Sequence, residues 1–166
     1  ALVFPGNRQD FATLEGILTG EAALQALSAY PHTPIGPPVL WPQRPDTPIY
    51  HNRGVWPFVT AYGLLAARHA GHEPLFTHDL DSLVRGAALN LSNMENLEFL
   101  TGRPWVDAGA ESGPVVNSRR QLWSVAGYLG AVVRGVFGVE LGQDHLTVRP
   151  FVPPDVHTRW LAGSAT

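Results

Sequence analysis

The sequence has no cysteine, few charged residues and no long apolar run. Without cysteine the chain has no disulfide framework and no thiolate chemistry. Charged residues make up 15% of the 166 positions and the net charge is −3. This composition gives no sign of a basic surface that would bind nucleic acid or an anionic membrane. No apolar run reaches the ~18 residues of a membrane span, and no signal-peptide pattern is present. The compartment is left open between the cytoplasm and the periplasm or cell exterior.

What the chain does contain is typical of a folded domain. Hydrophobic residues make up 45% of the sequence and aromatic residues 10%, which favours a packed core over disorder. The chain begins without Met and stops soon after a β-like stretch, so we expect a piece of a longer polypeptide. We divide it into a helical part over residues 1–138 and the start of a β domain over 139–166.

Apolar residues recur with the helical period in two long neighbouring stretches. The first predicts a helix over 54–70, with Pro57 in its first turn and Gly71 at its end. The second predicts a helix from Pro74 to about residue 99. The short link between them indicates an antiparallel αα-hairpin.

Two further helices are predicted outside this hairpin. A short one spans 21–30, and a long one over 118–137 begins with the capping box Ser118-x-x-Gln121. Glycines inside the long helix lower its propensity and indicate close helix packing; they are Gly127, Gly130 and Gly135.

Short strands are predicted over 139–141 and 146–152, around a turn at 142–144. The fold class is therefore mainly α: antiparallel αα-hairpins followed by a small C-terminal β annex.

Two loops lie at the ends of these helices. The loop over 31–49 carries seven prolines around Trp41 and Arg44. Proline fixes φ and removes backbone donors, so this loop is stiff and is either a binding element or a rigid connector. The second loop covers 101–117 and is rich in glycine and proline.

A polar and aromatic octapeptide closes the first loop, and it is our first candidate binding stretch. Its residues are Tyr50, His51, Asn52, Arg53, Gly54, Val55, Trp56 and Pro57. Hydrogen-bonding groups beside flat indole faces, including that of Trp41, favour a neutral polyhydroxylated ligand over a phosphate. The alternative is that His51 is a structural histidine and Trp56 belongs to the core.

Glu95 and Glu98 are the candidate catalytic residues. Three positions apart at the expected end of a helix, they share one face, and a carboxylate there meets an unfavourable macrodipole. This loss of stability is more easily understood if the carboxylate belongs to a functional site. The alternative is two solvated glutamates on a frayed helix end.

The third stretch runs from Asn117 to Gly127 and places Trp123 where it could form another wall of the same pocket. Arg119 and Arg120 could pair with an acidic residue; the candidates are Glu95, Glu98 and Glu111. The alternative is a capped core helix with surface arginines.

The sequence gives no reason to expect a metal or a cofactor. The seven histidines lack ligand spacing apart from His69 and His72, which we interpret as a C-terminal helix cap. No Gly-rich phosphate loop or nucleophile elbow is present.

In order, the three stretches resemble the C-terminal part of a six-hairpin, or (α/α)6-barrel, glycosidase. Tyr50-His51-Asn52-x-x-Val55-Trp56-Pro57 resembles the Y-H-N-G-x-V-W-P segment of bacterial glycogen-debranching and amylo-glucosidase-type domains. Glu95-Asn96-Leu97-x-x-x-Thr101-Gly102 is similar to the E-N-Y-x-P-x-T-G segment of the mannosyl-oligosaccharide glucosidase family, where the glutamate is the general base. Gln121-Leu122-Trp123-Ser124-Val125-Ala126 resembles the Q-x-W-S-x-A helix start of both groups.

The chain departs from these patterns at three positions. Leu97 replaces an aromatic residue, Phe99 replaces a proline, and Arg53 stands where a small residue is common. A shift of three residues would align Glu98 with the debranching pattern instead. The base is thus Glu95 or Glu98, and we favour Glu95.

The resemblance implies a partial α/α toroid and an inverting glycoside hydrolase that acts on a carbohydrate substrate. The general acid of such enzymes lies on an earlier hairpin, so we expect the isolated chain not to hydrolyse glycosides. The alternatives are a non-catalytic carbohydrate-binding or structural helical domain, and a sugar phosphorylase of the same fold with Arg119 and Arg120 as its cationic cluster. A partial barrel leaves an apolar strip, which favours a homo-oligomer or association with the rest of the barrel.

Overall fold

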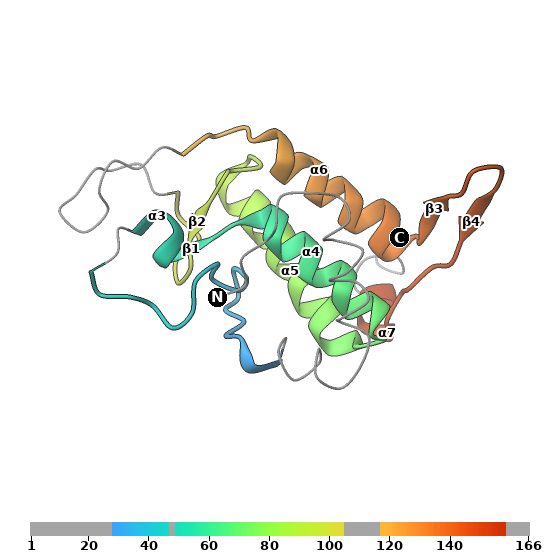
Figure 1. Cartoon of the computed structure of the whole chain (residues 1–166), viewed down its shortest axis with the longest axis horizontal. Coiled ribbons are helices and arrows are strands. Elements are labelled where there is room, and N and C mark those ends of the chain that lie inside the picture. The colour runs from blue at the N-terminus through green and yellow to red at the C-terminus, as the bar shows by residue number, and fades with distance from the viewer. Residues whose placement is uncertain (1–27, 47–48, 105–116, 159–166) are drawn as a thin grey trace.

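The computed structural model describes residues 28–46, 49–104 and 117–158, and within them the chain is mainly helical (Figure 1). The helical elements are α3 (Ile49–Asn52), α4 (Pro57–His69), α5 (Glu73–Asn90), α6 (Leu122–Gly130), the π-helical segment η1 (Ala131–Val136) and α7 (Pro154–Val156). The strands are β1 (Gly54–Val55), β2 (Leu97–Glu98), β3 (Val139–Leu141) and β4 (Leu146–Val148), in two antiparallel pairs. Most of the helix expected over 21–30 lies outside the described residues.

The helices α4 and α5 pack side by side as the predicted hairpin (Figure 1). Pro57 occupies the first turn of α4, where a missing N–H costs nothing, and Gly71 follows its end with φ of 69°. His72 is the N-cap of α5, because its Nδ1 accepts a hydrogen bond from the Leu75 amide at 3.2 Å. The His72 amide also donates to the Ala67 carbonyl at 2.8 Å, so His72 closes α4 through its backbone, whereas its side chain caps the start of α5.

The helix α5 ends at Asn90, about nine residues before the predicted end. Leu91 continues the apolar period, but it takes the left-handed conformation with φ of 48° and is 93% exposed. The side chain of Asn90 then donates to the carbonyls of Gly86 and Gly102, both at 2.9 Å. Glu95 consequently lies in the loop after α5 rather than at a helix end, so the macrodipole argument was wrong.

The next helix begins later than predicted and changes its geometry midway. Gln121 is the N-cap of α6 and makes no side-chain cap hydrogen bond, so the capping box was wrong. The helix continues through η1 to Val136, close to the predicted end. Close packing holds at Gly127, where an added Cβ would lie 3.1 Å from the Phe58 Cα, but not at Gly130, which has open space.

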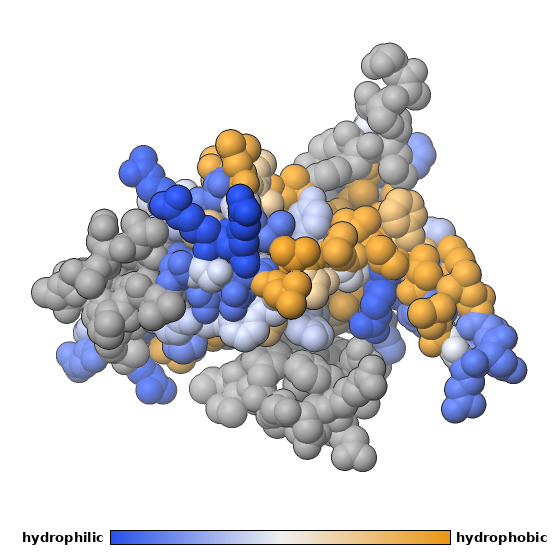
Figure 2. All heavy atoms as spheres, turned by 90° about the horizontal axis from the view of Figure 1, so that it is seen from above, coloured by the Kyte–Doolittle hydropathy of each residue, from blue (hydrophilic) through white to orange (hydrophobic). Residues whose placement is uncertain are grey.

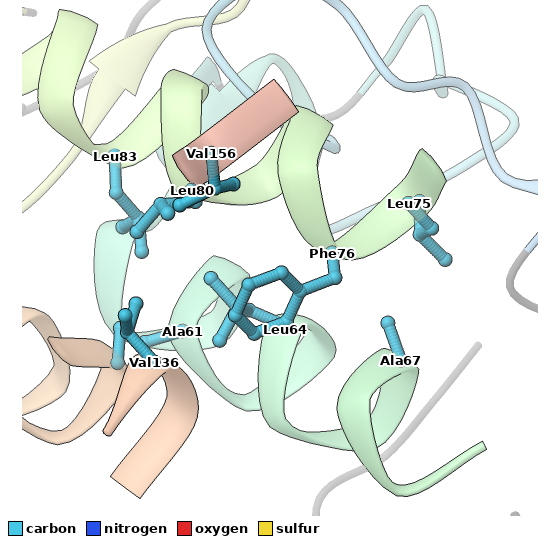
Figure 3. Close-up of a cluster of buried hydrophobic side chains, with 10 residues drawn as sticks. Ala61, Leu64, Ala67, Leu75, Phe76, Leu80, Leu83, Val136 and Val156 are labelled. Atoms are coloured by element: carbon cyan, nitrogen blue, oxygen red, sulfur yellow. The ribbon is translucent and has the colours of Figure 1, made fainter. Parts of the chain in front are cut away.

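One hydrophobic core joins the hairpin, η1 and the C-terminal segment (Figure 3). Leu64 of α4 and Phe76 of α5 are fully buried, and Val156 of α7 is 1% exposed against them. The rings of Phe76 and Phe151 meet edge to face at 4.9 Å. A second cluster includes one residue from each of β1 and β2; its members are Ile35, Val55, Met94 and Leu97.

The β annex is a single exposed hairpin of β3 and β4, in the register Val139↔Val148 and Leu141↔Leu146. The second strand ends at Val148 rather than at 152, because the chain turns back towards α7. Arg68 of α4 anchors this return by donating to the Arg149 carbonyl at 2.6 Å.

Figure 2 shows a band of hydrophobic side chains that runs along α6 and η1 towards the β3–β4 hairpin. The exposed large apolar side chains of α6, η1, the two strands and the residue after η1 are Leu122, Trp123, Leu129, Val133, Phe137, Leu141, Leu146 and Val148. The expected apolar strip is thus present, and the self-association that it favours stays a prediction. Among the helices described, none is long and apolar enough to cross a membrane.

Candidate functional site

Pairing of β1 with β2 brings the octapeptide against the glutamate stretch. Gly54 pairs with Glu98 and Val55 with Leu97, and the Phe99 amide donates to the Arg53 carbonyl at 3.2 Å. Glycine is required at position 54, because a Cβ there would lie 2.6 Å from the Tyr50 carbonyl oxygen. This sharp return places Tyr50 over the loop that carries Glu95.

Glu95 is the point at which the three stretches meet. Its side chain is buried, at 6% exposure. The hydroxyl of Tyr50 donates to Oε1 at 2.7 Å, and the amide of Ser118 donates to Oε2 at 2.9 Å. The Glu95 amide in turn donates to the Ser118 carbonyl at 2.9 Å. One carboxylate is therefore held by the octapeptide on one side and by the segment that precedes α6 on the other.

Tyr50 is a neutral donor at this position. Burial, the hydrogen bond to Glu95 and the negative charge of Glu95 together raise the pKa of Tyr50 to about 12. All three causes favour the protonated phenol, because the phenolate would be desolvated next to a carboxylate. Tyr50 thus keeps its proton and goes on donating to Glu95 at neutral pH.

Aromatic rings form a wall beside this carboxylate. His51 stacks on Trp56 with ring centroids 5.0 Å apart and planes 8° from parallel, and Trp56 meets Trp123 at 5.8 Å. Phe58 stacks on Trp123 at 5.2 Å and 30°. His51 is exposed, Trp123 is 43% exposed and Trp56 is buried behind them, with its indole N–H donating to the Tyr50 carbonyl at 3.3 Å.

Phe58 is the member of this wall that the sequence did not indicate as a site residue. In the sequence it is one of the apolar residues that recur with the helical period over 54–70. Its position two residues after Trp56, at the start of α4, is the signal that could have found it.

Glu98 has a different task from Glu95. Its Oε2 accepts hydrogen bonds from the amides of Leu100 and Thr101, at 3.1 and 2.6 Å. Both donors belong to the tight turn that follows β2, so this carboxylate holds its own turn. The structure does not bring it to the Tyr50–Glu95 contact.

Asn52 also has a structural task. Its Oδ1 accepts from the Arg44 amide at 2.6 Å and its Nδ2 donates to the Arg44 carbonyl at 2.5 Å. Asn52 is 4% exposed, so this pair of bonds fixes the proline-rich loop against α3. Arg53 is half-buried beside it, at the end of α3.

The remaining predicted site residues lie apart from the wall. Trp41 is 43% exposed on the proline-rich loop, and among the described residues no ring contact joins it to Trp56 or Trp123. Arg119 and Arg120 are exposed, and in the described part of the chain neither makes an ion pair with Glu95 or Glu98. Glu111 lies outside the described residues.

Asn117 is a further residue that the sequence did not assign to the site. Its Nδ2 donates to the Asn96 carbonyl at 3.1 Å, and its Oδ1 accepts from the Asn96 amide at 3.4 Å. These two bonds tie the loop that carries Glu95 to the segment before α6. They help to keep Ser118 at its hydrogen bond with Glu95.

The arrangement can accept a hydrogen bond or a proton from a hydroxyl at Glu95 and offer aromatic faces beside it. Among the described residues, the one group with the geometry of metal ligands lies elsewhere; it is formed by His32, His78 and Asp79. No protein family, curated protein or solved structure significantly matches this chain.

Proposed function

We propose that this chain is part of an inverting glycoside hydrolase of the α/α toroid type, in which it carries the general base, Glu95, and one wall of a sugar subsite. The observation that carries the proposal is the meeting of Tyr50, Ser118 and the Trp56–Trp123 wall at one buried carboxylate. The motif resemblance supports the same three stretches independently of that contact.

The chemistry of an inverting base agrees with the way in which Glu95 is held. Each carboxylate oxygen has two lone pairs, so each keeps one after its bond to Tyr50 or Ser118. A free lone pair can take the proton of a water that attacks the sugar on the face opposite the leaving group. The general acid is expected on an earlier hairpin and is assigned to no residue here.

The proposal selects Glu95 over Glu98. The amides of Leu100 and Thr101 already use Glu98 Oε2, and removing their acceptor would disturb the turn after β2. The aromatic wall lies beside Glu95 instead. Its exposed rings, His51 and Trp123, suit the C–H faces of a sugar.

A second candidate is a non-catalytic carbohydrate-binding domain. It is favoured by the fact that both oxygens of Glu95 accept protein hydrogen bonds and the side chain is only 6% exposed. In that role Glu95 positions Tyr50 and Ser118 and takes no proton. The sugar phosphorylase alternative would need Arg119 or Arg120 at the site, and no described contact supports this.

The first test measures binding of maltotriose to the chain by tryptophan fluorescence. Trp123→Ala should weaken binding about tenfold, because an aromatic contact contributes about 1.5 kcal/mol. Trp41→Ala is the matched control, because the two indoles are both 43% exposed and Trp41 lies outside the wall. Equal losses of maltotriose affinity in the two variants, or no binding by the unaltered chain, would contradict the proposed sugar subsite.

The second test separates the base from a binding role with α-glucosyl fluoride, whose leaving group needs no general acid. The unaltered chain should release fluoride above background. Glu95→Gln should reduce that rate about 100-fold or more, which is the scale of general-base catalysis, whereas Glu98→Gln should retain it. Maltotriose binding without fluoride release would favour the non-catalytic candidate.

A further inference from the structure

A compact group of two imidazoles and one carboxylate lies on the first half of α5. His78 and Asp79 are on this helix, and His32 reaches them from the start of the proline-rich loop. Asp79 Oδ1 lies 3.1 Å from His32 Nδ1 and 3.4 Å from His78 Nδ1. We propose that these three residues bind a divalent transition-metal ion of the zinc class, and that the ion fastens the segment around His32 to the helical hairpin.

Burial of the carboxylate is the first argument. Asp79 is 0% exposed, and a buried carboxylate is unfavourable unless a positive charge or several hydrogen bonds offset its desolvation. Its Oδ2 is buried without a hydrogen-bond partner in the described part of the chain. A divalent cation bound by the same three groups would supply that positive charge.

The separations of the ligand atoms are the second argument. Zinc binds imidazole nitrogen and carboxylate oxygen at about 2.0–2.1 Å, so the edge of its tetrahedron is about 3.3 Å. The observed 3.1 and 3.4 Å match this edge, and the candidate ligand atoms of all three residues lie within 4.8 Å of one another. The donor set of two imidazoles and one carboxylate is one that zinc and its neighbours in the first row prefer.

Space around the second carboxylate oxygen is the third argument. Gly63 of α4 faces Asp79, and a Cβ added there would lie 3.3 Å from Oδ2. The absence of a side chain at Gly63 thus keeps open the side of Asp79 where no donor of the described residues reaches. Oδ2 or a water molecule can complete a four-ligand shell.

The position of this group indicates a structural role. Asp79 precedes Asn90, the last residue of α5, by eleven positions, which is roughly 16 Å along the helix, and Glu95 follows that end. The ion would therefore lie outside the sugar subsite and would connect two parts of the chain distant in sequence. Because His32 and Asp79 are 47 positions apart, no local ligand spacing could reveal the site. This inference does not depend on the proposed function.

The test measures Zn²⁺ binding to the whole chain by equilibrium dialysis, with metal content determined by mass spectrometry. The chain should bind one Zn²⁺ and unfold at a higher temperature with the metal than without it. His78→Gln and His32→Gln should each weaken binding by about 100-fold or more, since even outer-shell changes cost 10–100-fold. His145→Gln is the matched control, because His145 Nδ1 also contacts an aspartate, Asp144, at 2.9 Å but on an exposed turn.

Two outcomes would overturn the proposal. One is the absence of Zn²⁺ binding; the other is binding that His145→Gln weakens as much as His78→Gln. His32→Gln provides a second ligand variant outside the helix if His78→Gln does not fold. Co²⁺ added to the unaltered chain should give the visible absorption of a low-symmetry four-ligand site, and a spectrum typical of the hydrated ion would count against it.

Discussion

Glu95 and Glu98 show that two carboxylates three positions apart can have separate tasks. Each accepts two hydrogen bonds, but the donors differ in their origin. Those of Glu98 come from the turn immediately after it, whereas those of Glu95 come from Tyr50 and Ser118, 45 and 23 positions away. A carboxylate held by distant donors is sensitive to how the whole fold is assembled, which is typical of a site rather than of a local turn.

The pKa of Tyr50 leads to a prediction about stability at high pH. A free tyrosine has a pKa of 10.0, and that of Tyr50 in the folded chain is about 12. The folded value is the higher one, so the contribution of the protonated phenol is complete below pH 10 and is lost as the pH rises from about 10 through about 12. The free energy of unfolding should therefore fall across this window, and Tyr50→Phe should make that fall shallower.

Urea unfolding followed at several pH values between 9 and 12 would measure this effect. Glu95→Gln is an informative partner variant, because it removes the charge that contributes to the raised pKa of Tyr50. Glu95→Gln should lower the pKa of Tyr50 in the folded chain, so that the loss of stability is complete at a lower pH. An identical pH dependence in the unaltered chain and in Tyr50→Phe would contradict the prediction.

At the scale of elements, the glycines of α6 permit a matched comparison. A Cβ added at Gly127 would lie 3.1 Å from the Cα of Phe58 and 3.2 Å from the Cβ of Ala61, so α4 and α6 would have to separate. A Cβ at Gly130 would meet nothing within 4 Å. Gly127→Ala should destabilise the chain by about 1–3 kcal/mol, through overpacking. Gly130→Ala should stabilise it by about 0.5–1 kcal/mol, because alanine favours the helix.

Denaturant midpoints of the two variants, three residues apart on one helix, would measure both effects. Stabilisation by both substitutions would mean that α4 and α6 are not in close contact at Gly127. Destabilisation by both would mean that the backbone at Gly130 has a requirement other than helix propensity.

The hairpin was predictable because periodicity and local signals agree there. Pro57, Gly71 and the apolar stripes of α4 and α5 all indicate the same two helices, and the structure has them. The end of α5 was not predictable, because Leu91 and Met94 continue the helical period while Leu91 turns out to solvent and Met94 is buried in a loop. A period describes which residues are apolar and not whether the backbone between them stays helical.

The candidate site was predictable only as a set of residue types. The order of the three stretches suggested that they meet, but it did not indicate the partners of Ser118 and Asn52, which are Glu95, 23 positions away, and Arg44, eight positions away. The hydroxyl of Ser118 was expected to cap a helix, whereas its amide binds Glu95. Asn52 was expected to face a ligand, which stays a prediction; the structure shows that its side chain also holds the backbone of Arg44. Tertiary contacts decide such assignments, and no local pattern contains them.

For the whole molecule, the core does not divide where the sequence was divided. The boundary at residue 138 separates the helical part from the β annex, yet Val156 and Phe151 lie beyond it and pack against the hairpin. The β3–β4 hairpin lies between these two parts of one core in sequence, and in space it projects from one end of the molecule (Figure 1). A segment that contributes to a common core should unfold together with it.

Val156→Ala tests this coupling between the C-terminal segment and the rest of the chain. Val156 is 1% exposed, and removing two buried methyl groups should lower the free energy of unfolding by about 2 kcal/mol. If the chain unfolds as one unit, the fluorescence of Trp56 and Trp123 at the candidate site will report the whole of that loss in a single transition. Val148→Ala, at a side chain 55% exposed on β4, is the control and should change stability by less than about 0.5 kcal/mol. The contrary result would be two unfolding transitions, of which Val156→Ala shifts only the one that tryptophan fluorescence does not report. It would show that the C-terminal segment folds as a separate unit.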